Sequence, residues 1–187
     1  MSDAFEETVH APAPRPARRR APVRPAAEPT VDLVELFFFA YRDFVGDADR
    51  LLENYRFGRA HHRVLHFVHR RPGLTIAALL DILKITKQSL NRVLKQLLDG
   101  GFVEARAGAT DRRQRRLYAT ARGAKLAREL TALQSRRFVR VLSELPPQSR
   151  EAAAAFLFAM IDAGERDGVR THFALARGED GAREGGS

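Results

Sequence analysis

Residues 74–123 read LTIAALLDILKITKQSLNRVLKQLLDGGFVEARAGATDRRQRRLYATARG. Apolar residues in the middle of this stretch recur at the i, i+3, i+4, i+7 and i+8 spacing that forms one stripe along an α-helix. They are Leu90, Val93, Leu94, Leu97 and Leu98. The periodicity predicts a helix from Lys87 to Asp99 that buries this stripe against the rest of the protein.

The opposite face of the predicted helix is polar and free to meet a partner. At 100° per residue it carries Gln88, Arg92, Lys95 and Gln96, with Ser89 and Asn91 on the flanks and Lys87 in the first turn. Thr86 can cap the start of the helix, and Gly100 with Gly101 permits a left-handed stop at its end.

A shorter helix precedes this one. Thr75 can cap it, and its inner face comprises Ile76, Leu79, Leu80 and Leu83. Only residues 84–86 separate the two helices, which is the connection length of a helix-turn-helix.

The pattern changes period after the two glycines. Residues 102–106 and 115–119 alternate or carry β-favouring side chains, and AGATDRRQ between them has the composition of a turn. We therefore expect a two-stranded ribbon, or wing, with a basic tip at 107–114. Residues 87–116 hold eight cations and three anions, more than half of the net charge of +9.

This combination suits duplex DNA. Arg and Lys neutralise phosphates, whereas Gln, Asn and Arg can pair with base edges in a major groove that admits a helix. The alternative is a charged face that is merely solvated, as most charged runs are.

The stretch resembles the winged-helix core of the MarR family of bacterial transcription regulators. The resemblance rests on ITKQSLNRVLKQLLDGGFVEAR and on the wing signature Asp-x-Arg, then Leu-x-x-Thr-x-x-Gly, which stands here at Asp111 to Arg113 and Leu117 to Gly123. It covers roughly residues 31–163, and GRAHHRVLHFV is similar to a proteobacterial subgroup of the PetP type. Gln88 and Asn91 depart from a common family pattern, so the operators of other members should not be transferred.

Base contacts are expected from Gln88, Ser89, Asn91 and Arg92. Phosphate contacts are expected from Lys87, Lys95, Arg112, Arg115 and Arg116. The resemblance implies that Arg113 approaches the minor groove and that Asp111 holds the wing arginines in place. Asp111 can also be an ordinary turn aspartate.

The predicted fold class is mainly α with a small β-wing: a winged helix-turn-helix at 59–119 between dimerisation helices at 31–57 and 120–163. Residues 1–30 are expected to be a disordered Pro/Arg-rich arm, and no apolar region of the kind a secretory signal has follows its basic cluster. The arm is expected either to be solvated or to contact phosphates. Residues 164–187 are expected to be a flexible tail. The apolar run at 152–161 is too short to span a bilayer, so no membrane partner is expected.

Aromatic residues crowd the first predicted helix. Phe37, Phe38 and Phe39 lie on more than one of its faces, which indicates a subunit interface and hence a homodimer. The alternative is a helix sunk in its own core. The resemblance supports the dimer, because that family pairs through its first and last helices.

Four histidines, at positions 61, 62, 66 and 69, lie on the predicted helix 59–71. Packing, effector binding or pH response, and metal binding are all open for them, although no third zinc ligand or HExxH glutamate accompanies the pair four residues apart. Family members often bind a small aromatic effector. Tyr41, His62 and His66 are candidates for such a pocket, or are core residues.

The predicted function is a homodimeric, sequence-specific transcription regulator that binds a pseudo-palindromic operator in double-stranded DNA and responds to a small effector. Absence of cysteine excludes disulfides and thiolate sites, and fits the cytoplasm. No cofactor, metal or enzymatic motif is implied. The alternative is a winged helix that binds an acidic protein or nucleic acid without sequence preference.

Overall fold

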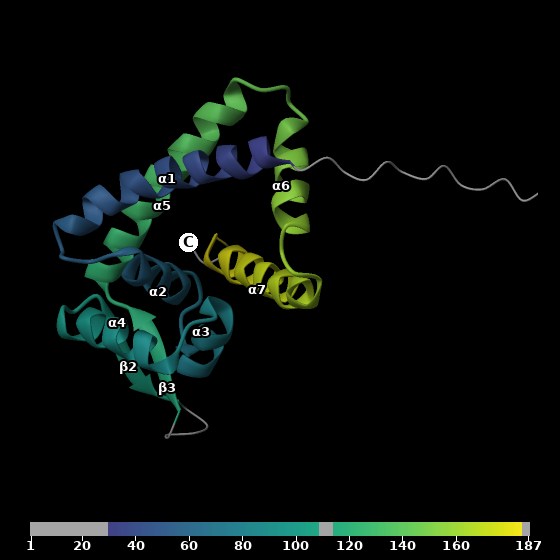
Figure 1. Ribbon diagram of the computed structural model, residues 1–187. Helices are drawn as coiled ribbons and strands as arrows, with labels where there is room; N and C mark the ends of the chain where they lie inside the picture. Colours follow the sequence, from purple (N-terminus) through teal and green to yellow (C-terminus); the bar gives the residue numbers. More distant parts are fainter. Residues whose placement is uncertain (1–29, 109–113, 185–187) are drawn as a thin grey trace, which may run out of the picture.

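The computed structural model describes residues 30–108 and 114–184, with side chains as far as residue 175. Its elements, in chain order, are α1 (Val31–Glu53), α2 (Arg59–Arg70), β1 (Leu74–Thr75), α3 (Ile76–Leu83), α4 (Lys87–Asp99), β2 (Val103–Ala107), β3 (Arg115–Ala119), α5 (Ala121–Ser143), α6 (Ser149–Ala159), the 3₁₀ turn η1 (Ala163–Glu165) and α7 (Arg166–Glu184). Two parts are visible: the winged unit of α2, α3, α4 and the ribbon, and an arm in which α1 crosses α5 (Figure 1).

The helix-turn-helix forms where the capping residues predict it. The Thr75 hydroxyl accepts a hydrogen bond from the Ala78 amide at 3.1 Å, and the Thr86 hydroxyl accepts one from the Ser89 amide at 3.2 Å. Each cap supplies a partner to an amide that the helix itself leaves unsatisfied. Lys84 ends α3 in the left-handed region, with φ of 50°.

The ribbon belongs to a three-stranded antiparallel sheet with the order β1-β3-β2. Leu117 pairs with Leu74 on one side and with Ala105 on the other. The sequence pattern predicts β2 and β3 but not β1, since a two-residue strand has no periodicity and exists only through its long-range pairing with β3. Phe102, expected to begin the ribbon, instead lies in the preceding turn with its side chain buried.

One apolar core joins the winged unit to the arm. It combines the inner stripes of α2, α3 and α4 with the sheet, the C-terminal half of α1 and the N-terminal half of α5. Its fully buried side chains include Leu52, Leu65, Leu79, Leu90, Leu97, Leu117, Leu126 and Leu130. The predicted apolar stripe of α4 is therefore buried, with Leu98 only partly so.

The C-terminal segment corrects the expectation of a flexible tail after residue 163. Helix α6 ends at Ala159, before residue 163, where the predicted dimerisation helices end. The chain then turns through η1 into α7, which lies back toward the winged unit (Figure 1). The Arg166 guanidinium donates to the carbonyls of Ala159 and Ile161 at 2.7 and 2.9 Å, satisfying acceptors at the end of α6. The ring of His172 lies 5.3 Å from that of Phe67 on α2. These tertiary contacts overrule the weak helix propensity of the glycines in this segment.

Candidate nucleic-acid interface

Helix α4 presents its predicted polar side chains on the outside of the winged unit. All seven are exposed, whereas Leu90 and Leu97 on the opposite side have no exposed area. They are Lys87, Gln88, Ser89, Asn91, Arg92, Lys95 and Gln96. The buried stripe therefore fixes which face of α4 a partner meets.

Two of these side chains, Ser89 and Lys95, have partners within α4 or at its N-cap. The Ser89 hydroxyl accepts a hydrogen bond from the Thr86 hydroxyl at 2.9 Å, which leaves its own proton to donate. The Lys95 ammonium lies 2.5 Å from a carboxylate oxygen of Asp99, one turn along the helix. A phosphate would have to compete with that exposed ion pair, whose contribution to stability is small.

The adjacent arginines of β3 lie on opposite faces of the sheet. Arg115 shares the face of Leu117 and lines a hollow of about 200 Å³ together with Asn91 and Lys95 of α4. Arg116 lies on the other face, half-buried, where it donates to the Gly73 carbonyl at 3.4 Å. Of these two arginines, Arg115 is therefore the one that continues the polar surface of α4.

Arg106 of β2 was not among the predicted DNA contacts, although it is one of the eight cations of residues 87–116. Arg106 pairs with Arg116 across the strands, forms an ion pair with Glu104, and places its guanidinium 4.5 Å from the ring centre of Tyr118. Alternation along β2 from the buried Val103 would have indicated its face. The Gly108 amide donates to the Gln114 carbonyl at 2.9 Å and closes the base of the tip. The predicted contacts Arg112 and Arg113, and the predicted wing-structural residue Asp111, lie outside the described residues.

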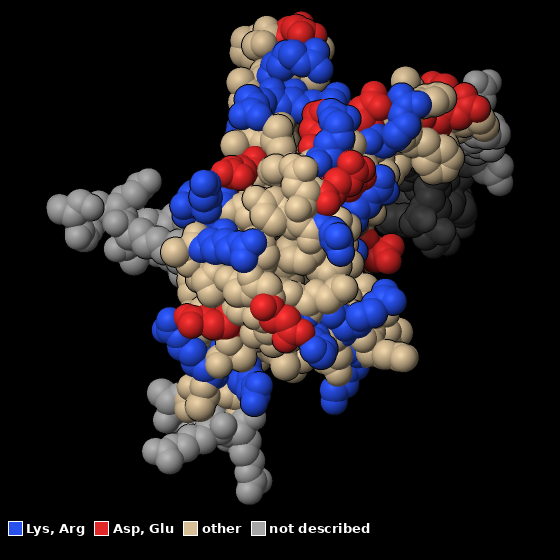
Figure 2. Space-filling model, turned by 90° about the vertical axis from the view of Figure 1, so that its left-hand side faces the viewer, with Lys and Arg blue, Asp and Glu red and all other residues tan. Residues whose placement is uncertain are grey.

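Basic side chains are not confined to α4. Lys and Arg side chains are spread over the face shown in Figure 2 from one end to the other, with acidic side chains among them and an area of other residues between. Positive charge therefore supplies a general attraction to a polyanion. The position of a specific contact depends on the geometry of α4 and the ribbon.

Among the three candidate effector residues, His62 and His66 are neighbours, whereas Tyr41 contacts other residues. Tyr41 is exposed, stacks on Phe37 with ring centres 6.3 Å apart, and lies 5.7 Å from the Arg59 guanidinium. The rings of His62 and His66 are 6.5 Å apart. Burial lowers the pKa of His62, and burial together with the positive field of His62 and Arg70 lowers the pKa of His66 to about 4. Both side chains are thus suited to an uncharged, packed state.

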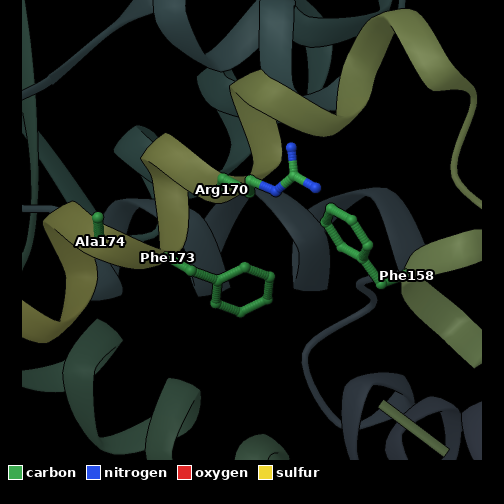
Figure 3. Close-up of a pocket in the computed structure, with 4 residues that line it drawn as sticks. All are labelled: Phe158, Arg170, Phe173 and Ala174. Carbon is green, nitrogen blue, oxygen red and sulfur yellow. The ribbon is translucent and has the colours of Figure 1, made fainter. Parts of the chain in front are cut away.

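A hollow of about 370 Å³ lies between α6 and α7 and is lined by other residues. Phe158, Arg170, Phe173 and Ala174 surround it, and the Arg170 guanidinium lies 4.9 Å from the ring centre of Phe158 (Figure 3). Within residues 30–108 and 114–175, no three histidine or acidic side chains are arranged to hold a metal ion. In the same described part of the chain, no helix has the length and hydropathy to cross a bilayer.

Comparison with known proteins agrees with this geometry. A sequence model described as MarR family matches residues 57–114, which contain α2, the helix-turn-helix and β2 but end before β3. The HTH-type transcriptional regulator PetP of Rhodobacter capsulatus is 47% identical over 144 residues, covering 77% of this chain and 84% of PetP. The chain belongs to the MarR family. It is therefore a DNA-binding transcriptional regulator by family.

Two further likenesses are consistent with this membership. The HTH-type transcriptional repressor Rv2887 of Mycobacterium tuberculosis is 36% identical over 88 residues, covering 46% of this chain and 63% of Rv2887. S. aureus MepR in its DNA-binding conformation superposes with a TM-score of 0.59 at 22% identity, covering 68% of this chain and 95% of MepR. The latter likeness establishes the shared fold.

The MarR-family motif that follows the wing has a visible structural purpose in this chain. Leu117 is buried in the sheet. Thr120 caps α5, accepting from the Gly123 amide at 3.1 Å while its hydroxyl donates to the Gly101 carbonyl at 2.7 Å. The motif thereby attaches α5 to the turn that ends α4.

Proposed function

We propose that this MarR-family chain acts as a homodimer that reads a pseudo-palindromic operator with α4 of each subunit. The observation that supports this most directly is the polar, exposed face of α4 above a stripe of fully buried leucines. A helix held in this way can enter a major groove without losing its packing.

The proposed contacts fall into two classes. Gln88, Ser89, Asn91 and Arg92 would meet base edges, because they lie in the first half of α4, which a helix-turn-helix directs into the groove. Lys87, Lys95 and Arg115 would meet phosphates from the same surface. Arg116, half-buried on the other face of the sheet, would reach a phosphate from the side of the wing. Arg112 and Arg113 are proposed from the family resemblance, with Asp111 as their partner.

The apolar surface of the arm supports the homodimer. Phe37, Phe38 and Phe39 are 46%, 65% and 56% exposed, and α5 and α6 carry exposed Phe138, Val139, Phe156 and Leu157. A soluble monomer rarely exposes so much contiguous apolar surface. A second subunit that covers it would bring two copies of α4 to half-sites about 10 bp, or a multiple of one turn, apart.

We further propose that a small aromatic effector modulates DNA binding and that the protein acts in the cytoplasm, where the operator is. Tyr41, His62 and His66 remain the candidate pocket residues. Saturation with aromatic acids should shift the midpoint of thermal unfolding of the wild type, and Tyr41→Ala with His66→Ala should remove that shift.

Selection from random duplexes at about 150 mM salt tests the main proposal, since salt suppresses non-specific phosphate attraction. Enrichment of a palindrome is expected, and Arg92→Ala should relax the preference at one position in each half-site. Arg113→Ala should weaken binding to all duplexes. Failure of a folded dimer to enrich any motif would overturn sequence-specific reading and would assign the basic face to a non-specific or acidic protein partner.

A further inference from the structure

His61, the third residue of α2, joins the start of that helix to α4. Its Nδ1 lies 3.1 Å from the amide nitrogen of Gly58, and its Nε2 lies 2.6 Å from Oε1 of Gln96. The ring stacks on Phe57 with centres 4.6 Å apart and planes within 7°. Three contacts thus hold one imidazole between two helices.

These contacts determine the direction of both hydrogen bonds. The Gly58 amide can only donate, so Nδ1 must accept and the proton of the neutral ring resides on Nε2. Nε2 therefore donates to Gln96, which must present its oxygen. The amide group of Gln96 is consequently oriented, with its oxygen toward His61 and its NH₂ group not engaged by that ring.

Gln96 lies one turn beyond Arg92 on the face proposed to meet DNA, and its side chain is exposed. Reading an adenine with an amide requires the oxygen and the nitrogen together. Because the hydrogen bond to His61 holds the oxygen toward α2, the NH₂ group of Gln96 is the part left to meet DNA. A phosphate oxygen is the DNA group that accepts from a donor at this position, beyond the first half of the helix.

We infer that Gln96 is a further contact to the DNA backbone and that His61 is its positioning residue. The inference rests on the proposed DNA-binding function. A neutral amide adds a hydrogen bond without releasing counterions, so it raises affinity for every duplex and leaves the salt dependence unchanged. Lysines and arginines on the same surface affect both quantities.

Replacement of Gln96 gives the first test. Gln96→Ala should weaken binding about three- to tenfold on selected and unrelated duplexes alike. The slope of log K against log salt should stay at the wild-type value. Lys95→Ala is the matched control, one residue away and also exposed. It should lower the magnitude of that slope by about 0.9 for a lost phosphate contact.

Replacement of His61 tests the positioning role. His61→Asn retains a short acceptor for the Gly58 amide but cannot span the distance to Gln96. It should weaken binding about two- to fivefold in the wild-type background and have no effect in the Gln96→Ala background. Gln96→Lys should bind DNA more tightly than Gln96→Ala and should steepen the salt slope. Its binding should be insensitive to His61→Asn, because an ammonium group needs no orientation.

The inference is overturned if Gln96→Ala binds within twofold of wild type, or if His61→Asn costs the same in both backgrounds. Thermal unfolding of each variant, with a midpoint near that of wild type, establishes that the compared proteins are folded. Arg92→Ala on the same duplexes distinguishes a failure of this inference from a failure of the proposed DNA-binding face. If Arg92→Ala also binds the selected duplex as wild type does, the proposed DNA face itself is wrong. If Arg92→Ala weakens binding and Gln96→Ala does not, only the proposed role of Gln96 is wrong.

Discussion

The carbonyl oxygen of Phe102 lies 1.9 Å from the point that a Cβ on Gly123 would occupy. The turn after α4 and the first turn of α5 therefore approach more closely than any residue with a side chain allows. Gly123→Ala should force these elements apart and destabilise the protein by about 1–3 kcal/mol, the usual cost of overpacking a core. Urea unfolding would measure the difference.

Gly46 provides the matched control for that substitution. It lies within α1, where an added Cβ would find only the end of the Arg50 side chain, at 3.8 Å. Gly46→Ala should stabilise the protein by about 0.5–1 kcal/mol through helix propensity. Equal midpoints for the two variants would contradict the packing argument.

The half-buried His66 predicts a loss of stability in acid. Its pKa falls from 6.5 to about 4 on folding, so between these values the unfolded chain binds a proton that the folded chain does not. Stability is therefore complete above pH 6.5 and declines as the pH falls toward 4, by about 3 kcal/mol in all. His66→Gln should reduce this slope, as measured by urea unfolding at fixed protein concentration. Unchanged slopes would show that His66 is not the responsible group.

Phe38 predicts the oligomeric state. Its ring is 65% exposed in the single subunit. Phe38→Glu should yield a folded monomer in size-exclusion chromatography with light scattering, because a charge cannot be buried there unpaired. Phe38→Leu keeps the surface apolar and should remain dimeric. A dimeric Phe38→Glu protein would place the interface elsewhere.

Thr86 predicts a link between stability and DNA binding. Its hydroxyl accepts from the Ser89 amide and donates to the Ser89 hydroxyl. Thr86→Ala should cost about 1 kcal/mol, as the loss of an N-cap does, and should fray the turn that carries Gln88 and Ser89. Thr86→Ser should preserve both. Circular dichroism and duplex titration measure the two effects, and normal values for Thr86→Ala would refute the role of the cap.

The helix-turn-helix could be predicted because its signals are local. The spacing of Leu90 to Leu97 and the caps at Thr75 and Thr86 lie within single elements, and the bounds of α4 agree with the structure. The strand β1, the fold-back of α7 and the link from His61 to Gln96 depend on residues 35 or more positions apart. Such pairings leave no period in the sequence.

The two arginines of β3 show what sequence patterns leave open at the candidate DNA interface. Charge counting treats Arg115 and Arg116 as equivalent, but strand alternation gives one to the surface of α4 and the other to the opposite face. The side to which each points depends on which neighbour is buried. Leu117 decides this, as the fully buried member of the strand.

The exposed aromatic surface of α1 also predicts how mutant alleles of this protein behave beside an intact copy. It is distant in sequence from α4, so a subunit whose reading helix has been inactivated still carries everything needed to pair. In a cell that makes both forms, random pairing at equal amounts would place a defective subunit in three of every four assemblies, by the symmetry of a two-subunit protein. Alleles damaged in α4 should therefore be dominant over the intact gene, whereas alleles damaged at Phe38 should be recessive.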